Sequence, residues 1–243
     1  MIPLLALLLA ADDPAERCVS LARADPAEAE RMAERWSLTG GAKAKQCLGL
    51  ALTEQSRYGE AAAAFEDAAR AAEVAKDMMA ATYWAEAGNA RLAANDPARA
   101  RAALDAALAA GTLQGTERGE AHLDRARALV AAGDARGARD DLDAATRDAA
   151  ADPLAWLLSA TLARRMNDLP RARADIAEAL KRSADDAQVQ LEAGNIAALS
   201  GDEAGARKAW SAAQRIAPTA PAGVAAAQAL AQFNGDHSNE KKP

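Results

Sequence analysis

The chain contains few aromatic residues, few histidines and few cysteines. Aromatic residues make up 3% of the 243 residues, whereas hydrophobic residues together make up 51%. Most apolar side chains are therefore alanine and leucine, and this composition favours closely packed helices over a core of large side chains. The net charge of −6 argues against nucleic acid as a partner, because phosphate binding requires a concentrated basic surface.

The sequence also lacks the patterns of a metal site or a catalytic site. Its two histidines and two distant cysteines cannot supply a zinc ligand set. There is no glycine-rich phosphate loop, and no nucleophile stands at a recognisable spacing from a basic partner. We therefore expect no cofactor and no enzymatic activity. One acidic stretch is interpreted as a solvated helix face with charge pairs, formed by Asp140, Asp141 and Asp143 with Arg136 and Arg139.

The first eleven residues, MIPLLALLLAA, are apolar and stand before two aspartates. They are too few to span a bilayer, which requires about 20 residues. Their length and small final residues predict a signal peptide over 1–11, and hence export. However, no Lys or Arg precedes the apolar core. The alternatives are an apolar first helix packed on the rest of the chain, or a start codon assigned too late. We expect no integral membrane span.

Cys18 and Cys47 fall in the predicted first helices of two neighbouring helix hairpins. A disulfide between them would close a loop of about 30 residues and stabilise the fold by roughly 3–4 kcal/mol. The alternative is a pair of small buried thiols in a reduced compartment.

The stretch 187–218 is the clearest helix hairpin of the chain. Gly201-Asp202 forms its turn, and Asp202 is placed to cap the second helix. Ala206 and Trp210 follow on one face of that helix, and Pro218 ends it.

Four other stretches repeat this hairpin. The alanine that follows each turn, called here the anchor, recurs with separations of 39, 38, 34 and 34 residues at Ala61, Ala100, Ala138, Ala172 and Ala206. Twelve residues before each anchor is a small residue, where the two helices are expected to cross: Gly49, Gly88, Ala126, Ala160 and Gly194. Four residues after each anchor is a large apolar residue: Phe65, Leu104, Leu142, Ile176 and Trp210.

This pattern resembles the tetratricopeptide repeat, whose period is 34 residues. Trp84 and Trp156 occupy the tryptophan position of that family, and Gly88-Asn89 and Gly194-Asn195 repeat its Gly-Asn pair. His122 stands at the same position as the two tryptophans, which favours a packing role for it. The resemblance covers residues 42–218. It implies an all-α, right-handed solenoid of stacked antiparallel helix hairpins that binds other proteins.

The expected organisation follows from the repeats. After the signal peptide, residues 12–41 form a degenerate hairpin with helices at about 14–23 and 26–37. Five repeats begin near residues 42, 81, 119, 153 and 187 and continue to 218. Residues 219–233 are expected to form a capping helix that shields the last hairpin, and 234–243 a disordered tail.

The first helices of such an array line its concave face, where a partner is expected to bind. Asn can hold a peptide backbone, and Arg can bind a carboxylate with both arms of its guanidinium. The candidate peptide-binding residues are Asn89, Arg127, Arg164, Arg165 and Asn195. Other residues expected to face the partner include Gln46, Leu123, Leu157 and Thr161.

The sequence therefore predicts a non-enzymatic scaffold for a protein or peptide partner, located in the bacterial periplasm or secreted. A cytosolic adaptor or regulatory subunit is the alternative. It would require the apolar start to be structural and both thiols to remain reduced.

Overall fold

The computed structural model describes residues 13–239, with side chains described as far as residue 233. The predicted signal peptide, 1–11, lies outside these residues, as does the end of the predicted tail, 240–243. The chain forms two compact units, unit 1 (Met1–Leu113) and unit 2 (Gln114–Pro243), and each is described by itself.

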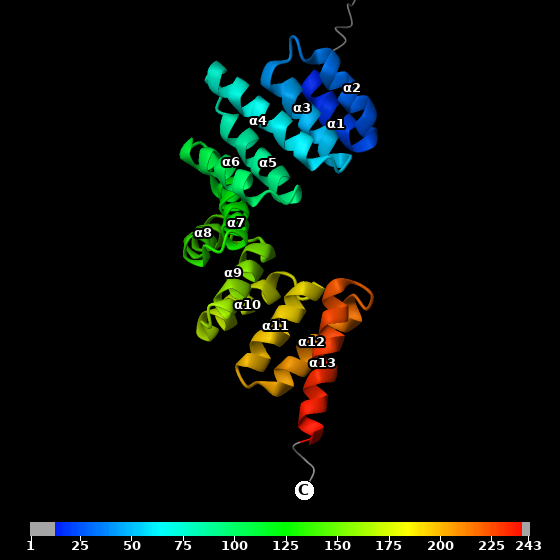
Figure 1. Cartoon of the computed structure of the whole chain (residues 1–243), viewed down its shortest axis with the longest axis vertical. Coiled ribbons are helices and arrows are strands. Elements are labelled where there is room, and N and C mark those ends of the chain that lie inside the picture. Colours follow the sequence, from blue (N-terminus) through cyan, green and yellow to red (C-terminus); the bar gives the residue numbers. More distant parts are fainter. Residues whose placement is uncertain (1–12, 240–243) are drawn as a thin grey trace, which may run out of the picture. The chain divides into compact units, whose positions relative to one another are not determined.

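Within each unit, every described helix packs against the next one in the chain (Figure 1). No strand occurs among residues 13–239. The predicted all-α fold of consecutive helix hairpins is confirmed. Unit 1 contains α1 (Pro14–Ala24), α2 (Pro26–Trp36), α3 (Gly41–Glu54), α4 (Tyr58–Ala75), α5 (Ala80–Ala93) and α6 (Pro97–Ala109). Unit 2 contains α7 (Gly115–Ala131), α8 (Ala135–Asp148), α9 (Pro153–Arg165), α10 (Leu169–Arg182), α11 (Ala187–Leu199), α12 (Glu203–Ile216) and α13 (Pro221–Asn239).

The turn inside each of the five hairpins contains a residue in the left-handed backbone region. Glycine and asparagine adopt this region at the lowest cost. In four hairpins the next residue is an aspartate whose Oδ1 accepts a backbone N–H from the first turn of the second helix, which satisfies a donor that the helix itself leaves unpaired. The left-handed residues are Ser56, Asn95, Gly133, Asn167 and Gly201, with φ of 59°, 56°, 81°, 61° and 78°.

Where the two helices of a hairpin cross, a glycine lies directly against a large side chain of the second helix. A Cβ added at Gly49 would lie 2.5 Å from the ring of Phe65, and one added at Gly88 would lie 2.5 Å from Leu104. Small residues at the crossing therefore let the two backbones approach while the large residue fills the space beside them.

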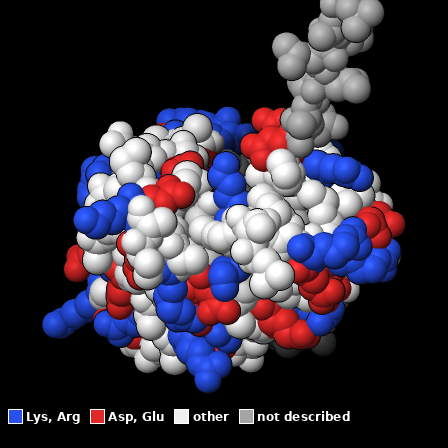
Figure 2. Space-filling view, turned by 90° about the horizontal axis from the view of Figure 1, so that it is seen from above, with Lys and Arg blue, Asp and Glu red and all other residues white. Residues whose placement is uncertain are grey.

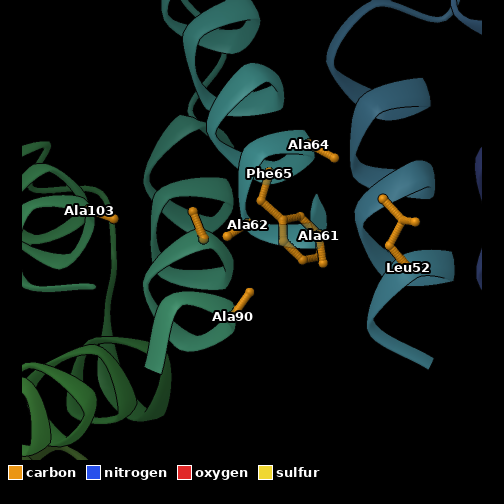
Figure 3. Close-up of a cluster of buried hydrophobic side chains, with 8 residues drawn as sticks. Leu52, Ala61, Ala62, Ala64, Phe65, Ala90 and Ala103 are labelled. Carbon is orange, nitrogen blue, oxygen red and sulfur yellow. The ribbon is translucent and has the colours of Figure 1, made fainter. Parts of the chain in front are cut away.

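The core of unit 1 is built mainly from alanine. One buried cluster joins α3, α4, α5 and α6 (Figure 3). Phe65 is its single aromatic ring, and it lies beside alanines of α4 and faces the helix that carries Leu52. Such short side chains place neighbouring helices close together, in agreement with the low aromatic content of the chain.

A disulfide joins Cys18 in α1 to Cys47 in α3, with the two Cα atoms 5.7 Å apart. Both residues are at most 2% exposed and pack against Ala33, with Met32 and Trp36 beside them. Since Cys18 and Ala22 are the buried residues of α1, the disulfide is a large part of what holds this helix to the first repeat.

At the other end of the chain, α13 covers the last hairpin. The rings of Trp210 and Phe233 meet edge to face with centroids 5.5 Å apart, and Ala226 is fully buried against α12. The helix continues to Asn239, beyond residue 233, where the sequence places its end.

Candidate functional site: a groove between α7 and α9

The first helices of two consecutive hairpins of unit 2, α7 and α9, border an apolar pocket of about 180 Å³. Leu142 of α8 contributes to its lining between them. A second pocket of about 160 Å³ shares Val130, Leu162 and Arg165 with the first, and it continues towards the ends of α7 and α9. The two pockets form what we call the α7–α9 groove, lined by Ala126, Arg127, Val130, Gly133, Ala135, Leu142, Leu158, Thr161, Leu162, Arg165 and Met166.

Two of the predicted binding residues, Arg127 and Arg165, meet in this groove. Arg127 lies one residue after the helix crossing, in register with Thr161 of the next repeat, which also lines the groove. The Arg127 guanidinium is 2.8 Å from a carboxylate oxygen of Asp124 on the same helix. Arg165 is exposed and makes no hydrogen bond or ion pair among the residues that the structure describes.

The groove thus combines an apolar floor with two guanidinium groups, and no acidic residue contributes to its lining. An apolar side chain can enter it while a neighbouring carboxylate binds to arginine. These are the features of a surface that can recognise a segment carrying both groups.

The other predicted residues of unit 2 take part in contacts within the protein. Arg164 is paired with Glu192, with Nε 2.6 Å from Oε1. Asn195 accepts a hydrogen bond from Nε1 of Trp210 at 3.0 Å, and its amide lies 3.4 Å from Glu192. This network joins α9, α11 and α12, so Arg164 and Asn195 also serve the packing of the repeats.

Asn89 lies in unit 1 and is exposed on α5. It stands one turn from Glu86, whose carboxyl group has an unusual environment. Glu86 accepts a hydrogen bond from Gln46 of α3 at 2.9 Å, and its second oxygen has no partner among the described residues. Burial raises the pKa of Glu86 to about 7, because the charged form loses its hydration. Asn89 does not line the α7–α9 groove, which lies in unit 2.

Two details of the expected face are corrected by the structure. Leu123 and Leu157 were expected to face a partner but are buried at 4% and 6% exposure. Instead Val130 and Leu158 line the groove, and the sequence analysis did not single them out. In α9 the open side begins one position later, at Leu158, and a shift of one residue moves a side chain about 100° around the axis.

The acidic stretch of α8 is also different from the expected solvated face. Asp141 is 3% exposed and accepts hydrogen bonds from Arg125, while His122 Nδ1 lies 2.8 Å from its Oδ1. His122 therefore has a polar partner at the position where two other repeats carry tryptophan. The bonds from Arg125 and His122 outweigh burial and lower the pKa of Asp141.

Other kinds of site find no support among the described residues. No group of three potential metal ligands occurs in residues 13–239. Within the same range, no helix combines the length and the apolar character needed to cross a membrane. On the face shown in Figure 2, Lys and Arg alternate with Asp and Glu.

Three solved structures illustrate the similarity of the fold. PilF of Pseudomonas aeruginosa is 15% identical, with a TM-score of 0.73, over 93% of this chain and 98% of that one. PilW, a widely conserved type IV pilus biogenesis factor, is 19% identical with a TM-score of 0.71, over 86% and 94%. YrrB, a TPR protein with an unusual peptide-binding site, is 19% identical with a TM-score of 0.60, over 80% and 96%.

A comparison with curated proteins gives no match. In contrast, the family model for the tetratricopeptide repeat matches residues 85–153 and 157–221, which together are more than half of the chain. The protein therefore belongs to the tetratricopeptide repeat family, whose fold is a scaffold that binds proteins and peptides and is typically not enzymatic.

Proposed function

We propose that the protein is a non-enzymatic scaffold that binds an extended segment of a partner protein in the α7–α9 groove. The observation that carries this proposal is the position of Arg165, an exposed guanidinium without an ion-pair partner among the described residues, at the edge of an apolar pocket. Such a site favours a segment in which an apolar residue stands beside a carboxylate. The peptide-binding site of YrrB, a protein of the same fold, supports a peptide as the ligand class.

The proposed ligand is recognised by two parts of the groove. Val130, Leu158 and Leu162 would contact the apolar side chain of the segment. Arg127 and Arg165 would bind its carboxylate. Since Arg127 already pairs with Asp124, Arg165 makes the larger contribution to the attraction of an acidic segment.

We further propose that the protein works outside the cytoplasm. The apolar residues 1–11 and the Cys18–Cys47 disulfide support this location, because disulfides persist in oxidising compartments. The similarity of the fold to PilF and PilW makes components of the bacterial cell envelope suitable partners to test first. A cytosolic adaptor or regulatory subunit is the alternative and would contain Cys18 and Cys47 as thiols.

A displayed library of short random peptides tests the groove. Peptides selected on the wild-type protein are titrated against Arg127→Ala/Arg165→Ala, with Arg136→Ala as the control, because Arg136 is exposed on α8 and does not line the groove. We expect the double variant to bind at least about tenfold more weakly, as the loss of two charge-assisted contacts implies. Equal binding by all three proteins would place the site elsewhere.

The location is tested separately by the intact mass of the protein from its native cells under non-reducing conditions. Export predicts a mass that lacks about eleven N-terminal residues and is lower by two hydrogens. A full-length, fully reduced protein would support the cytosolic adaptor and would leave the groove proposal unaffected.

A further inference from the structure

A second groove lies elsewhere in unit 2, among the helices α10, α11 and α12. Its volume is about 430 Å³. Ile176 and Leu180 of α10 and Ile196 of α11 form its apolar wall, and Arg173 and Lys208 stand at its rim. We call it the α10–α12 groove. It shares no lining residue with the α7–α9 groove.

One repeat earlier, the same place between α8, α9 and α10 is filled by a network of charged residues. Arg139 reaches across to α9, where its Nη2 donates to Oγ of Ser159 at 2.6 Å and its Nη1 donates to the Ser159 carbonyl at 3.2 Å. Ser159 in turn donates to Asp175 of α10, and it is fully buried. Arg171 completes the network by pairing with Asp175 at 3.2 Å and with Asp143.

The repeat register relates the two places residue by residue, since Ala172 and Ala206 are equivalent anchors. Arg139 corresponds to Arg173, and so the arginine is retained. The three residues that surround it in the filled groove are replaced by small ones: Ala193 for Ser159, Gly205 for Arg171 and Ala209 for Asp175. The α10–α12 groove is open because these replacements remove the side chains that would fill it. The arginine also loses both of its side-chain acceptors, since Ser159 is replaced by Ala193 and Asp143, which pairs with Arg139, by Ala177.

Unit 1 shows that small residues alone do not leave a groove open. Among α4, α5 and α6 the equivalent positions are Ala62, Ala87 and Ala103, and all three are buried at 0–4% exposure. Figure 3 shows Ala62 and Ala103. There the helices pack closely enough for alanine to fill the space. In the α10–α12 groove, by contrast, Arg173 is exposed, and Ala193 and Ala209 are only partly buried.

The charges of the open groove are unbalanced. Arg173 and Lys208 make no ion pair among the described residues. Asp202 is the one acidic lining residue, and its Oδ1 accepts the Gly205 N–H at 2.9 Å as the cap of α12. Ser200, on the same wall, has a buried Oγ without a hydrogen-bond partner in the described part of the chain. The groove therefore carries two cationic side chains and one carboxylate, which already caps α12.

We propose that the α10–α12 groove is a second docking site, which takes an acidic segment of a partner protein. A carboxylate of the segment enters the open groove, near the place that Asp175 holds in the preceding repeat, and binds the Arg173 guanidinium at the rim. An adjacent aliphatic side chain packs on Ile176 and Ile196. The complementarity of charge selects an acidic segment over a neutral one, since Arg173 and Lys208 both face it.

The test uses the displayed library of short random peptides. Peptides are selected on the wild-type protein and then grouped by how strongly they bind each variant. Arg173→Ala removes the guanidinium. Ala193→Ser/Ala209→Asp restores the serine and the carboxylate that Ser159 and Asp175 supply beside Arg139 in the preceding repeat, and Ala193→Ser/Ala209→Asn has the same shape without the charge. All three change residues that are exposed or partly buried, and so the fold is expected to persist, as circular dichroism can verify.

We expect one class of selected peptides to contain Asp or Glu beside Leu, Ile or Val. This class should bind Arg173→Ala and Ala193→Ser/Ala209→Asp about fivefold more weakly than wild type, the range of one charged contact near the surface. Binding to Ala193→Ser/Ala209→Asn should fall less than binding to the Asp variant. Arg127→Ala/Arg165→Ala should bind this class as the wild type does, which separates it from peptides of the α7–α9 groove.

Two results would overturn the proposal. One is a selection in which no peptide class depends on Arg173 while remaining independent of Arg127 and Arg165. The other is an Arg173-dependent class without acidic residues. Neither result bears on the α7–α9 groove, which is tested separately with Arg127→Ala/Arg165→Ala.

Discussion

A Cβ atom added at Gly194 would lie 2.4 Å from the indole ring of Trp210, closer than real side chains approach one another. The ring cannot move away easily, because Phe233 packs against it and its Nε1 donates to Asn195 at 3.0 Å. Glycine is therefore required at position 194, because the indole ring of Trp210 occupies the space that a side chain would need.

Gly194→Ala is therefore expected to destabilise the protein by about 1–3 kcal/mol through overpacking. Urea unfolding followed by circular dichroism measures the change. Gly59→Ala is the matched control, because nothing lies within 4 Å of a Cβ at that helical position. The control should be stabilised by about 0.5–1 kcal/mol. Equal effects of the two substitutions would contradict the assigned crossing.

The disulfide is expected to provide much of the stability of the N-terminal hairpin. Cys18→Ala/Cys47→Ala should lower the free energy of unfolding by about 3 kcal/mol, since the two residues are 29 positions apart. Unfolding is measured with and without a reductant. Reductant should destabilise the wild type and leave the double variant unchanged, and an equal response of both proteins would mean that the bond contributes nothing.

Ser56 is the one left-handed turn residue of the five hairpins that is neither glycine nor asparagine, and its φ is 59°. Ser56→Gly should relieve this conformation and stabilise the protein by about 1 kcal/mol, the cost of the left-handed region for an ordinary residue. Thermal unfolding gives the comparison. Asn95→Gly is the control and should change the stability less, because asparagine tolerates φ of 56° better than serine does.

Glu86 makes the stability depend on pH. Burial raises its pKa from 4.5 to about 7 in the folded protein, and so the folded state holds its proton more tightly than the unfolded state. The stability that this proton linkage contributes is fully present below about pH 4.5 and is lost as the pH rises through about 7.

Glu86→Gln should therefore stabilise the protein at about pH 8, by on the order of 2 kcal/mol, and change little at about pH 5. Gln46 can still donate its hydrogen bond to the new amide oxygen. Denaturant midpoints of both proteins at the two pH values measure the difference. A gain of the same size at both values would mean that ionisation of Glu86 is not its cause.

The repeat architecture could be predicted because the residues that define it act locally. A turn residue such as Gly201 indicates a left-handed backbone, and the aspartate after it, such as Asp202, indicates the cap of the next helix. The crossing residues recur at a constant distance from an anchor, so Gly194 and Trp210 could be paired without a structure. These features can be recognised from the spacing of residues along the chain alone.

The grooves could not be predicted in this way, since they depend on residues from three helices. Arg139, Ser159 and Asp175 are far apart in the sequence, and each is ordinary on its own helix. Charges at spacings of three and four residues along one helix indicated solvated pairs. In the structure Arg139 makes the expected pair with Asp143, and in addition it reaches across to Ser159 of the neighbouring repeat. Only the packing of repeat on repeat distinguishes these two arrangements.

The contrast between the two successive joints of unit 2 has a mechanical consequence. Between α8 and α10, the ion pair of Arg171 with Asp143 opposes any change in the separation of the helices, and Arg139 ties α8 to Ser159 of α9. Between α10 and α12 such cross-links are missing among the described residues, and alanine and glycine face an open groove. The ion pair between these two repeats, Arg164–Glu192, lies instead between α9 and α11. A change in the angle between the repeats would therefore open or close the α10–α12 groove while α9 and α11 stay together.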